Sequence, residues 1–353
     1  MAFNIGLTSR SRFDFTVRFA KKSFLFSTKV FAEKFHKWEC TKDTETTERD
    51  EEDRVETNSS LPGNEIHGFK NEIESLKNFL LDQKVYDEFK SLVVVGEYGV
   101  GKTALCKTIF NDDEVKSVYA PRIWISMHSK KSKEGLDKKI YVMKKILKVL
   151  LLEDDLLKSF RIEASEEARA KLEAGESDGD TAKEKELSDL LYALHLNLRW
   201  KKYLVVFDDV REEDNWNEML QDDEFKLNKD KQWGKHLSGG FPKGSGGRVI
   251  YTTRDVRMAM KLVAEEHEIH RLWPLSDPES VWKIYKAVIE KIYTEIPRNN
   301  KKCIEELMNK SRGLPLAVRS MATLNPVFID DFQNPRLSES TSPEDDKLPS
   351  TSS

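Results

Sequence analysis

The sequence predicts an α/β fold: a three-layer arrangement in which helices cover both faces of a parallel sheet, followed by a small helical subdomain. Three stretches predict it. The apolar run 92–95 leads through a glycine-rich loop into a helical pattern. A second apolar run, 203–207, ends in two carboxylates, and a glycine loop precedes a third run at 248–253. Continuous apolar runs of this length are typical of strands buried on both faces.

The composition is that of a protein with an ordinary core and no strong attraction to nucleic acid. The 353 residues are 38% hydrophobic and 34% charged, with a net charge of −4, so two or three domains are expected and nucleic-acid binding is not. No apolar run approaches the roughly 18 residues of a membrane span. The three cysteines, Cys40, Cys106 and Cys303, lack zinc-site spacing. We therefore expect a reduced, cytoplasmic location.

The N-terminal 61 residues divide into two stretches of opposite character. Residues 1–40 are basic and aromatic, and three interpretations fit them: a docked helix or the remnant of a larger domain, an interfacial helix in peripheral contact with an anionic membrane, or an organelle transit peptide. Residues 41–61 are acidic and polar with almost nothing to bury, which predicts a disordered linker.

The loop from Gly96 to Thr103 has the pattern G-x-x-x-x-G-K-[ST]. Its glycines allow a tight turn whose backbone N–H groups point at phosphate oxygens. The helix that follows, 102–110, offers its positive end to the same anion. Lys102 would reach the β- and γ-phosphates, and the Thr103 hydroxyl would bind Mg²⁺. The pattern therefore predicts a nucleoside-polyphosphate site.

The remaining elements of this part follow from periodicity. Apolar residues share one face of a predicted helix at 70–81, and 122–126 reads as the second strand. A lysine-ringed amphipathic pattern predicts one helix over 136–160. The charge-dense stretch 161–187 is interpreted as a partly helical, partly flexible insertion. A leucine stripe at 187–198 predicts the next helix.

The strand 203–207 delivers Asp208 and Asp209 to the carboxyl edge of the sheet. Asp208 would hold Mg²⁺ through water, and Asp209 would polarise the attacking water as a general base. An apolar strand that ends in an acid is common in itself. Together with the phosphate loop, however, these acids predict a function, because the two motifs complete one nucleotide–Mg²⁺ site.

Arg254 follows the third strand, where it would sense a γ-phosphate from the carboxyl end of a strand that neighbours the loop. The alternative is a surface arginine at the start of the helix 255–263. Beyond it, a further strand is expected at 267–272. Three helices follow, at 277–293, 300–308 and 316–324, and a polar tail occupies 326–353.

Six motifs in a fixed order give the sequence a specific likeness. They read GEYGVGKTAL, RIWISM, KKYLVVFDDV, GSGGRVIYTTR, LWPLSDPESVWKIY and RGLPLAV. Over residues 62–325 the chain resembles the NB-ARC domain of plant intracellular immune receptors, the NLR disease-resistance proteins, which belong to the STAND class of P-loop NTPases. The likeness implies a P-loop nucleotide-binding domain at 62–272 and a helical ARC1-like subdomain at 273–325.

The resemblance implies roles for particular residues. Thr103 and Asp208 would hold the metal, Asp209 would be the catalytic carboxylate that polarises water, and Arg254 would be the sensor. Phe69 stands where the family's adenine-contacting segment has an arginine, so only apolar and backbone contacts are carried over there. The residues implied in binding ADP or ATP are Gly96, Gly99, Val100, Gly101, Lys102, Thr103, Ala104, Ile66 and Pro315.

The departures from the family pattern shape the expected function. No MHD motif and no leucine-rich period occur in this sequence, and Arg211 stands where a tryptophan is common. The resemblance implies a short, truncated accessory member that switches between ADP and ATP in plant defence, with protein partners in immune signalling such as other NLR proteins. Hydrolysis would be slow at most. The alternatives are a non-cycling adaptor or decoy and a housekeeping P-loop ATPase.

Overall fold

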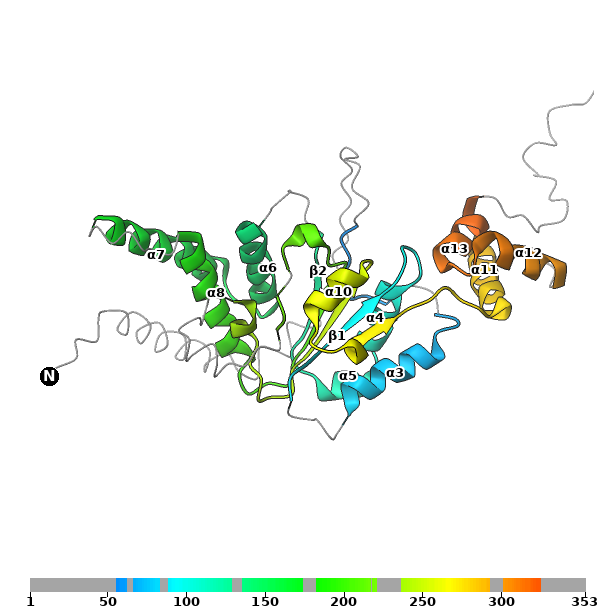
Figure 1. The fold of residues 1–353 in the computed structure, drawn as a ribbon, viewed down its shortest axis with the longest axis horizontal. Helices are drawn as coiled ribbons and strands as arrows, with labels where there is room; N and C mark the ends of the chain where they lie inside the picture. Colours follow the sequence, from blue (N-terminus) through cyan, green and yellow to red (C-terminus); the bar gives the residue numbers. More distant parts are fainter. Residues whose placement is uncertain are drawn as a thin grey trace, which may run out of the picture. The chain divides into compact units, whose positions relative to one another are not determined.

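A computed structural model describes residues 55–61, 66–82, 88–128, 135–173, 182–216, 218–220, 236–292 and 301–324 (Figure 1). All of them belong to one of the two compact units into which the chain divides, Arg54–Ser353. The predictions for the basic segment 1–40, for the linker up to residue 54 and for the tail 326–353 fall outside the described residues.

Five strands of the described chain form one parallel sheet in the order β2-β3-β4-β1-β5. The central strands are buried along almost their whole length, as their uninterrupted apolar sequences predict. The strand bounds are β1 Lys90–Val95, β2 Arg122–Ser126, β3 Leu204–Asp208, β4 Arg248–Thr253 and β5 Ile269–Arg271.

The strand register gathers the polar strand ends at one edge. Val95, the last residue of β1, pairs with Thr253, and Ser126 at the end of β2 pairs with Asp208. Because all pairs are parallel, the loops after β1, β3 and β4 leave the sheet at the same edge. The phosphate loop, the two acids and Arg254 are therefore neighbours in space although they are far apart in sequence.

Helices cover both faces of the sheet. On one face, α3 (Lys70–Leu81), α4 (Lys102–Phe110) and α5 (Asp113–Val118) share a hydrophobic cluster with Val94 and Val206. Phe207, the next residue of β3, points the other way and stacks on Tyr251. On that side α6 (Gly135–Val149) contacts β2 and packs on α8 (Ala182–Leu198), while α10 (Val256–Leu262) contacts β1 and β4. The predicted three-layer α/β fold is confirmed.

The described chain after the sheet is helical. The helices α11 (Pro278–Ile292), α12 (Lys301–Ser311) and α13 (Pro315–Leu324) pack on one another and bury Tyr285, Leu307 and Val318.

Short 3₁₀ turns occur at Glu212–Asp214, Leu237–Gly240 and Glu266–Glu268. None of the described helices combines the length and the apolar character needed to cross a membrane.

The single helix expected over 136–160 is wrong, because the chain forms two helices there. The first, α6, ends at Val149, and α7 begins at Asp154. Leu151 takes a left-handed φ of 65°, and the N–H groups of Leu151 and Leu152 donate to Lys148 O and Leu147 O. This is a Schellman ending. It usually has glycine at the left-handed position, so the leucine there hid the break from the sequence pattern.

The expected insertion at 161–187 is more helical than its composition suggested. The helix α7 (Asp154–Glu173) runs through its first half, α8 covers 182–187, and 174–181 lie outside the described residues. The two helices pack together, with Ala164 fully buried and Glu167 paired to Lys185 at 3.3 Å. Burial of one narrow face stabilises helix in a segment whose overall composition is polar.

Candidate nucleotide-binding site

The phosphate loop has the backbone geometry of an anion site. It leaves β1 at Gly96 and enters α4 at Lys102, with Gly99 at φ 80° and Gly101 at φ 112°. Both values lie in the left-handed region, which a glycine adopts without strain. No side chain caps the N-terminus of α4, so its first backbone N–H groups face the loop. Uncapped N–H groups at a helix start are what phosphate oxygens bind.

Lys102 lies inside this loop and is only 8% exposed. Its Nζ donates to Gly96 O at 2.7 Å and to Glu97 O at 2.9 Å. Burial, and secondly the nearby Arg254 charge, lower the pKa of Lys102 to about 8. A phosphate group next to the ammonium would oppose both effects, because an anion favours the charged form. The chain thus holds a cation that an anionic ligand stabilises.

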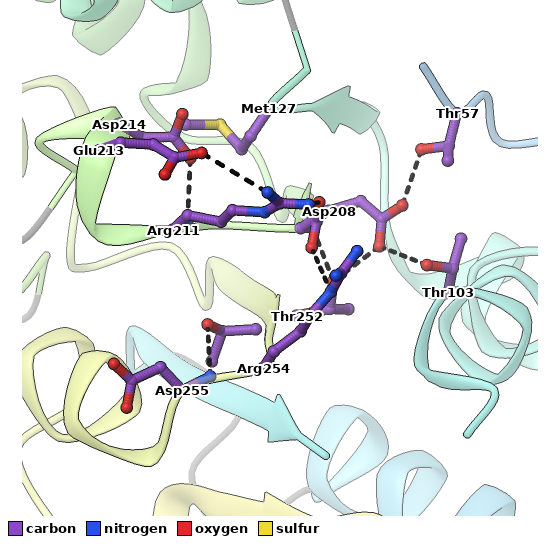
Figure 2. Close-up of polar contacts among 12 residues, drawn as sticks. Thr57, Thr103, Met127, Asp208, Arg211, Glu213, Asp214, Thr252, Arg254 and Asp255 are labelled. Carbon is purple, nitrogen blue, oxygen red and sulfur yellow. Dashed lines mark hydrogen bonds and ion pairs between the residues drawn. The ribbon is translucent and has the colours of Figure 1, made fainter. Parts of the chain in front are cut away.

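Asp208 gathers three threonine hydroxyls at the end of β3, as Figure 2 shows. Its Oδ1 accepts from Thr103 Oγ1 at 2.9 Å and from Thr252 Oγ1 at 2.7 Å, and its Oδ2 accepts from Thr57 Oγ1 at 2.7 Å. The carboxylate is almost completely buried, at 1% exposed. A hydroxyl and a carboxylate are the hard oxygen ligands that Mg²⁺ prefers, so Thr103 and Asp208 fit that metal.

Two of these threonines were absent from the predicted site. Thr252 lies on β4 beside β3, where a hydroxyl at the end of a strand was a usable signal. Thr57 gave no signal, because it lies in the stretch expected to be a disordered linker. The described part of that stretch, 55–61, is instead docked on the domain, which corrects the prediction for these residues.

Asp209 is paired with two arginines. Its Oδ2 lies 3.1 Å from Arg211 Nη2, and its Oδ1 lies 3.5 Å from Arg254 Nε. Both arginines hold the carboxylate of Asp209, and its predicted role as a general base stays a prediction.

Arg254 lies at the open side of the loop with its side chain 30% exposed. Its guanidinium stacks over the ring of Tyr98, 4.4 Å from the ring centroid, and pairs with Asp209. Tyr98 belongs to the phosphate loop, so Arg254 is held against that loop. The role predicted for Arg254 as a phosphate sensor is compatible with this position and stays a prediction.

The helical subdomain touches the phosphate loop directly. The backbone N–H of Leu316, at the start of α13, donates to Gly99 O at 3.2 Å, and a Cβ on Gly99 would lie 2.7 Å from Leu316 Cβ. One turn earlier, Leu275 N–H donates to Gly313 O at 2.9 Å. Pro315 lies between these two contacts as the first residue of α13 and is half-buried.

The segment before α3 packs against the phosphate loop. Phe69 is 4% exposed, and its ring packs against Gly101, where an added Cβ would lie 3.3 Å from Phe69 Cε2. Ile66 is half-buried and packs against the same core. The ring of Phe69 thus packs against the phosphate loop at Gly101. The apolar character of Phe69, directly before the predicted helix 70–81, was the available indication in the sequence.

Comparisons with known proteins agree with this geometry. The model of the NB-ARC domain matches residues 69–228. Probable disease resistance protein At5g45440 of Arabidopsis thaliana is 63% identical over 326 residues, which cover 92% of this chain and 89% of that protein. Probable disease resistance protein At5g45490 of Arabidopsis thaliana is 65% identical over 82% of this chain and 82% of its own length. Probable disease resistance protein At4g19060 of the same plant is 48% identical over 81% of this chain and 79% of its own length. The chain therefore belongs to the NB-ARC family of P-loop nucleotide-binding proteins, together with these disease resistance proteins.

Proposed function

We propose that the protein is a switch that binds ADP or ATP with Mg²⁺ and acts in plant defence signalling. The names of the relatives support the defence context, and proteins of immune signalling are the corresponding partners. The phosphate loop, Lys102 and the Thr103–Asp208 pair support the nucleotide and the metal.

One contact carries the proposal of a switch: the hydrogen bond from Leu316 N–H to Gly99 O. Gly99 belongs to the loop that would wrap the phosphates, and Leu316 belongs to the first turn of α13. A change in the number of phosphates alters the loop, and the loop alters its contact with α13. A ligand shifts an equilibrium only through contacts that differ between two states, and this contact is one that can differ.

Each residue then has a defined part. The N–H groups at the start of α4 and the Lys102 ammonium bind phosphate oxygens. Thr103 and Asp208 hold Mg²⁺, which neutralises phosphate charge when bound. Arg254, held by Tyr98 and Asp209, contacts the terminal phosphate. Pro315 and Ile66 flank the nucleoside.

The pairing of Asp209 favours a switch over a housekeeping ATPase. Rapid turnover needs a group that orients or deprotonates the attacking water. Asp209, the acid next to the metal ligand, is engaged with Arg211 and Arg254 instead. Slow hydrolysis, which resets a switch between signals, is the activity that this arrangement favours.

Replacement of Asp208 by asparagine tests the metal assignment. Asp208→Asn keeps the shape and an acceptor for the threonine hydroxyls but removes the negative charge that Mg²⁺ needs. We expect the ratio of ADP affinities with and without Mg²⁺, measured by isothermal titration calorimetry, to fall about tenfold or more. The matched control is Asp113→Asn, whose carboxylate is 97% exposed on α5. An undiminished ratio in Asp208→Asn would refute the role of Asp208.

A further inference from the structure

Residues 55–61, called the docked segment below, lie outside the part of the chain that matches the NB-ARC model, 69–228. Three contacts tie the docked segment to three different elements. Asn111 Nδ2, at the end of α4, donates to Ser59 O at 2.7 Å, and Lys145 Nζ of α6 pairs with Glu56 Oε1 at 2.8 Å. Trp124 Nε1 of β2 donates to Thr57 Oγ1 at 3.1 Å. The docked segment is thus held against α4, α6 and the edge strand β2.

The contact with Trp124 fixes the direction of the Thr57 hydroxyl. An indole N–H can only donate, so Thr57 Oγ1 accepts from it and has its single proton left to give. That proton goes to Asp208 Oδ2, 2.7 Å away (Figure 2). Thr252 is oriented in the same way, because it accepts from the Asp209 N–H at 2.8 Å and donates to Asp208 Oδ1.

The hydrogen bonds on Asp208 leave one acceptor site of its carboxylate available. A carboxylate offers about four lone-pair sites, two on each oxygen. Among the described residues, Thr103 and Thr252 donate to Oδ1, whereas Thr57 alone donates to Oδ2. The remaining acceptor site is therefore on Oδ2, the oxygen that Thr57 holds, and this is where a metal-bound water would donate.

We propose that Thr57 is a positioning residue of the nucleotide site, and that the docked segment completes this site through the chain Trp124 → Thr57 → Asp208. The inference rests on the proposed function, because it assigns to Thr57 the task of aiming Asp208 at Mg²⁺. Preorganised neighbours of a metal ligand hold it in the geometry that the metal needs, and their loss weakens binding.

This arrangement couples the metal site to the docking of the segment. If docking strengthens the binding of Mg²⁺ with nucleotide, then binding strengthens docking by the same factor, because coupling free energies are reciprocal. The docked segment directly follows the acidic stretch that begins at residue 41. The occupancy of the nucleotide site is therefore coupled to the docking of residues 55–61, which precede the part of the chain that matches the NB-ARC model.

Thr57→Val tests the proposal, since valine has nearly the same shape and lacks the hydroxyl. We expect the ratio of ADP affinities with and without Mg²⁺ to fall about tenfold, the effect of one hydrogen bond to a charged group. Thr57→Ser should restore the ratio. Amide hydrogen exchange of residues 55–61 should be slowed by Mg²⁺–ADP in the unmodified chain, and less so in Thr57→Val. The control Asn58→Ala alters an exposed neighbour whose Oδ1 accepts from Ser60 N–H.

The possible outcomes separate this inference from the proposed function. An unmodified chain that gains affinity from Mg²⁺, with Thr57→Val showing the same gain, would overturn the inference alone. A larger gain in Thr57→Val would also overturn it, because Thr57 would then compete with the metal for Asp208. An unmodified chain that binds no nucleotide would overturn the proposed function and this inference with it.

Discussion

Lys102→Ala is expected to abolish measurable binding of ADP and ATP. The side chain lies inside the phosphate loop, where its ammonium donates to Gly96 O and Glu97 O. A bound phosphate would accept hydrogen bonds from the same ammonium. Each charge-assisted hydrogen bond contributes about 1.5–3 kcal/mol, so two of them correspond to a loss of roughly 100-fold or more in affinity. Equilibrium binding of a fluorescent ADP analogue measures the loss.

The control for this substitution is Lys116→Ala. Lys116 lies on α5, and its pair with the 97% exposed Asp113 is a surface contact of little energy. Binding by this variant should equal that of the unmodified chain. Circular dichroism should show that both variants keep their helical content. Tight ADP binding by a folded Lys102→Ala protein would show that the loop from Gly96 to Thr103 is not the phosphate site.

Gly313→Ala is expected to destabilise the protein more than any surface change. Gly313 has φ 73°, in the left-handed region that costs an alanine about 1–2 kcal/mol. Its added Cβ would lie 2.0 Å from Leu275 O, in a place where Leu275 N–H is tied to Gly313 O. Neither backbone can yield without breaking that hydrogen bond. We expect a loss of about 4–5 kcal/mol in the free energy of unfolding, measured by urea denaturation.

Gly244→Ala is the matched control for that change. No heavy atom lies within 4 Å of a Cβ placed on Gly244, and its φ lies outside the left-handed region. The free energy of unfolding should change by less than about 0.5 kcal/mol. Leu316, three residues after Gly313, contacts Gly99 in the phosphate loop. The Gly313→Ala protein should therefore also bind ADP more weakly. Equal stability of the two variants would contradict the packing of the Gly313 turn on Leu275.

The sequence predicted what depends on local pattern and composition. The strands at 92–95 and 203–207 are apolar along their length, and a strand, a glycine loop and a helix in succession specify the backbone of the phosphate loop. The parallel sheet then places Asp208 beside Thr103. These features are encoded by neighbouring residues, so a single sequence reveals them.

Features that depend on distant contacts were missed. The break at Leu151 needs a left-handed leucine, and the helices on either side of it, α6 and α7, each pack on α8. Residues 55–61 have little to bury, and their order comes from hydrogen bonds to Asn111, Trp124 and Asp208. The partners of Asp209 come from a following turn and from another strand. No periodicity within these segments could indicate such contacts.

The most direct test of the account is the nucleotide that the purified protein carries. The protein would be denatured, and the released nucleotide identified and quantified by chromatography. We expect about one ADP per chain, since the uncapped start of α4 and the buried Lys102 would bind its phosphates and α13 contacts the same loop at Gly99. A protein that is purified without nucleotide and binds neither ADP nor ATP in the presence of Mg²⁺ would contradict the account.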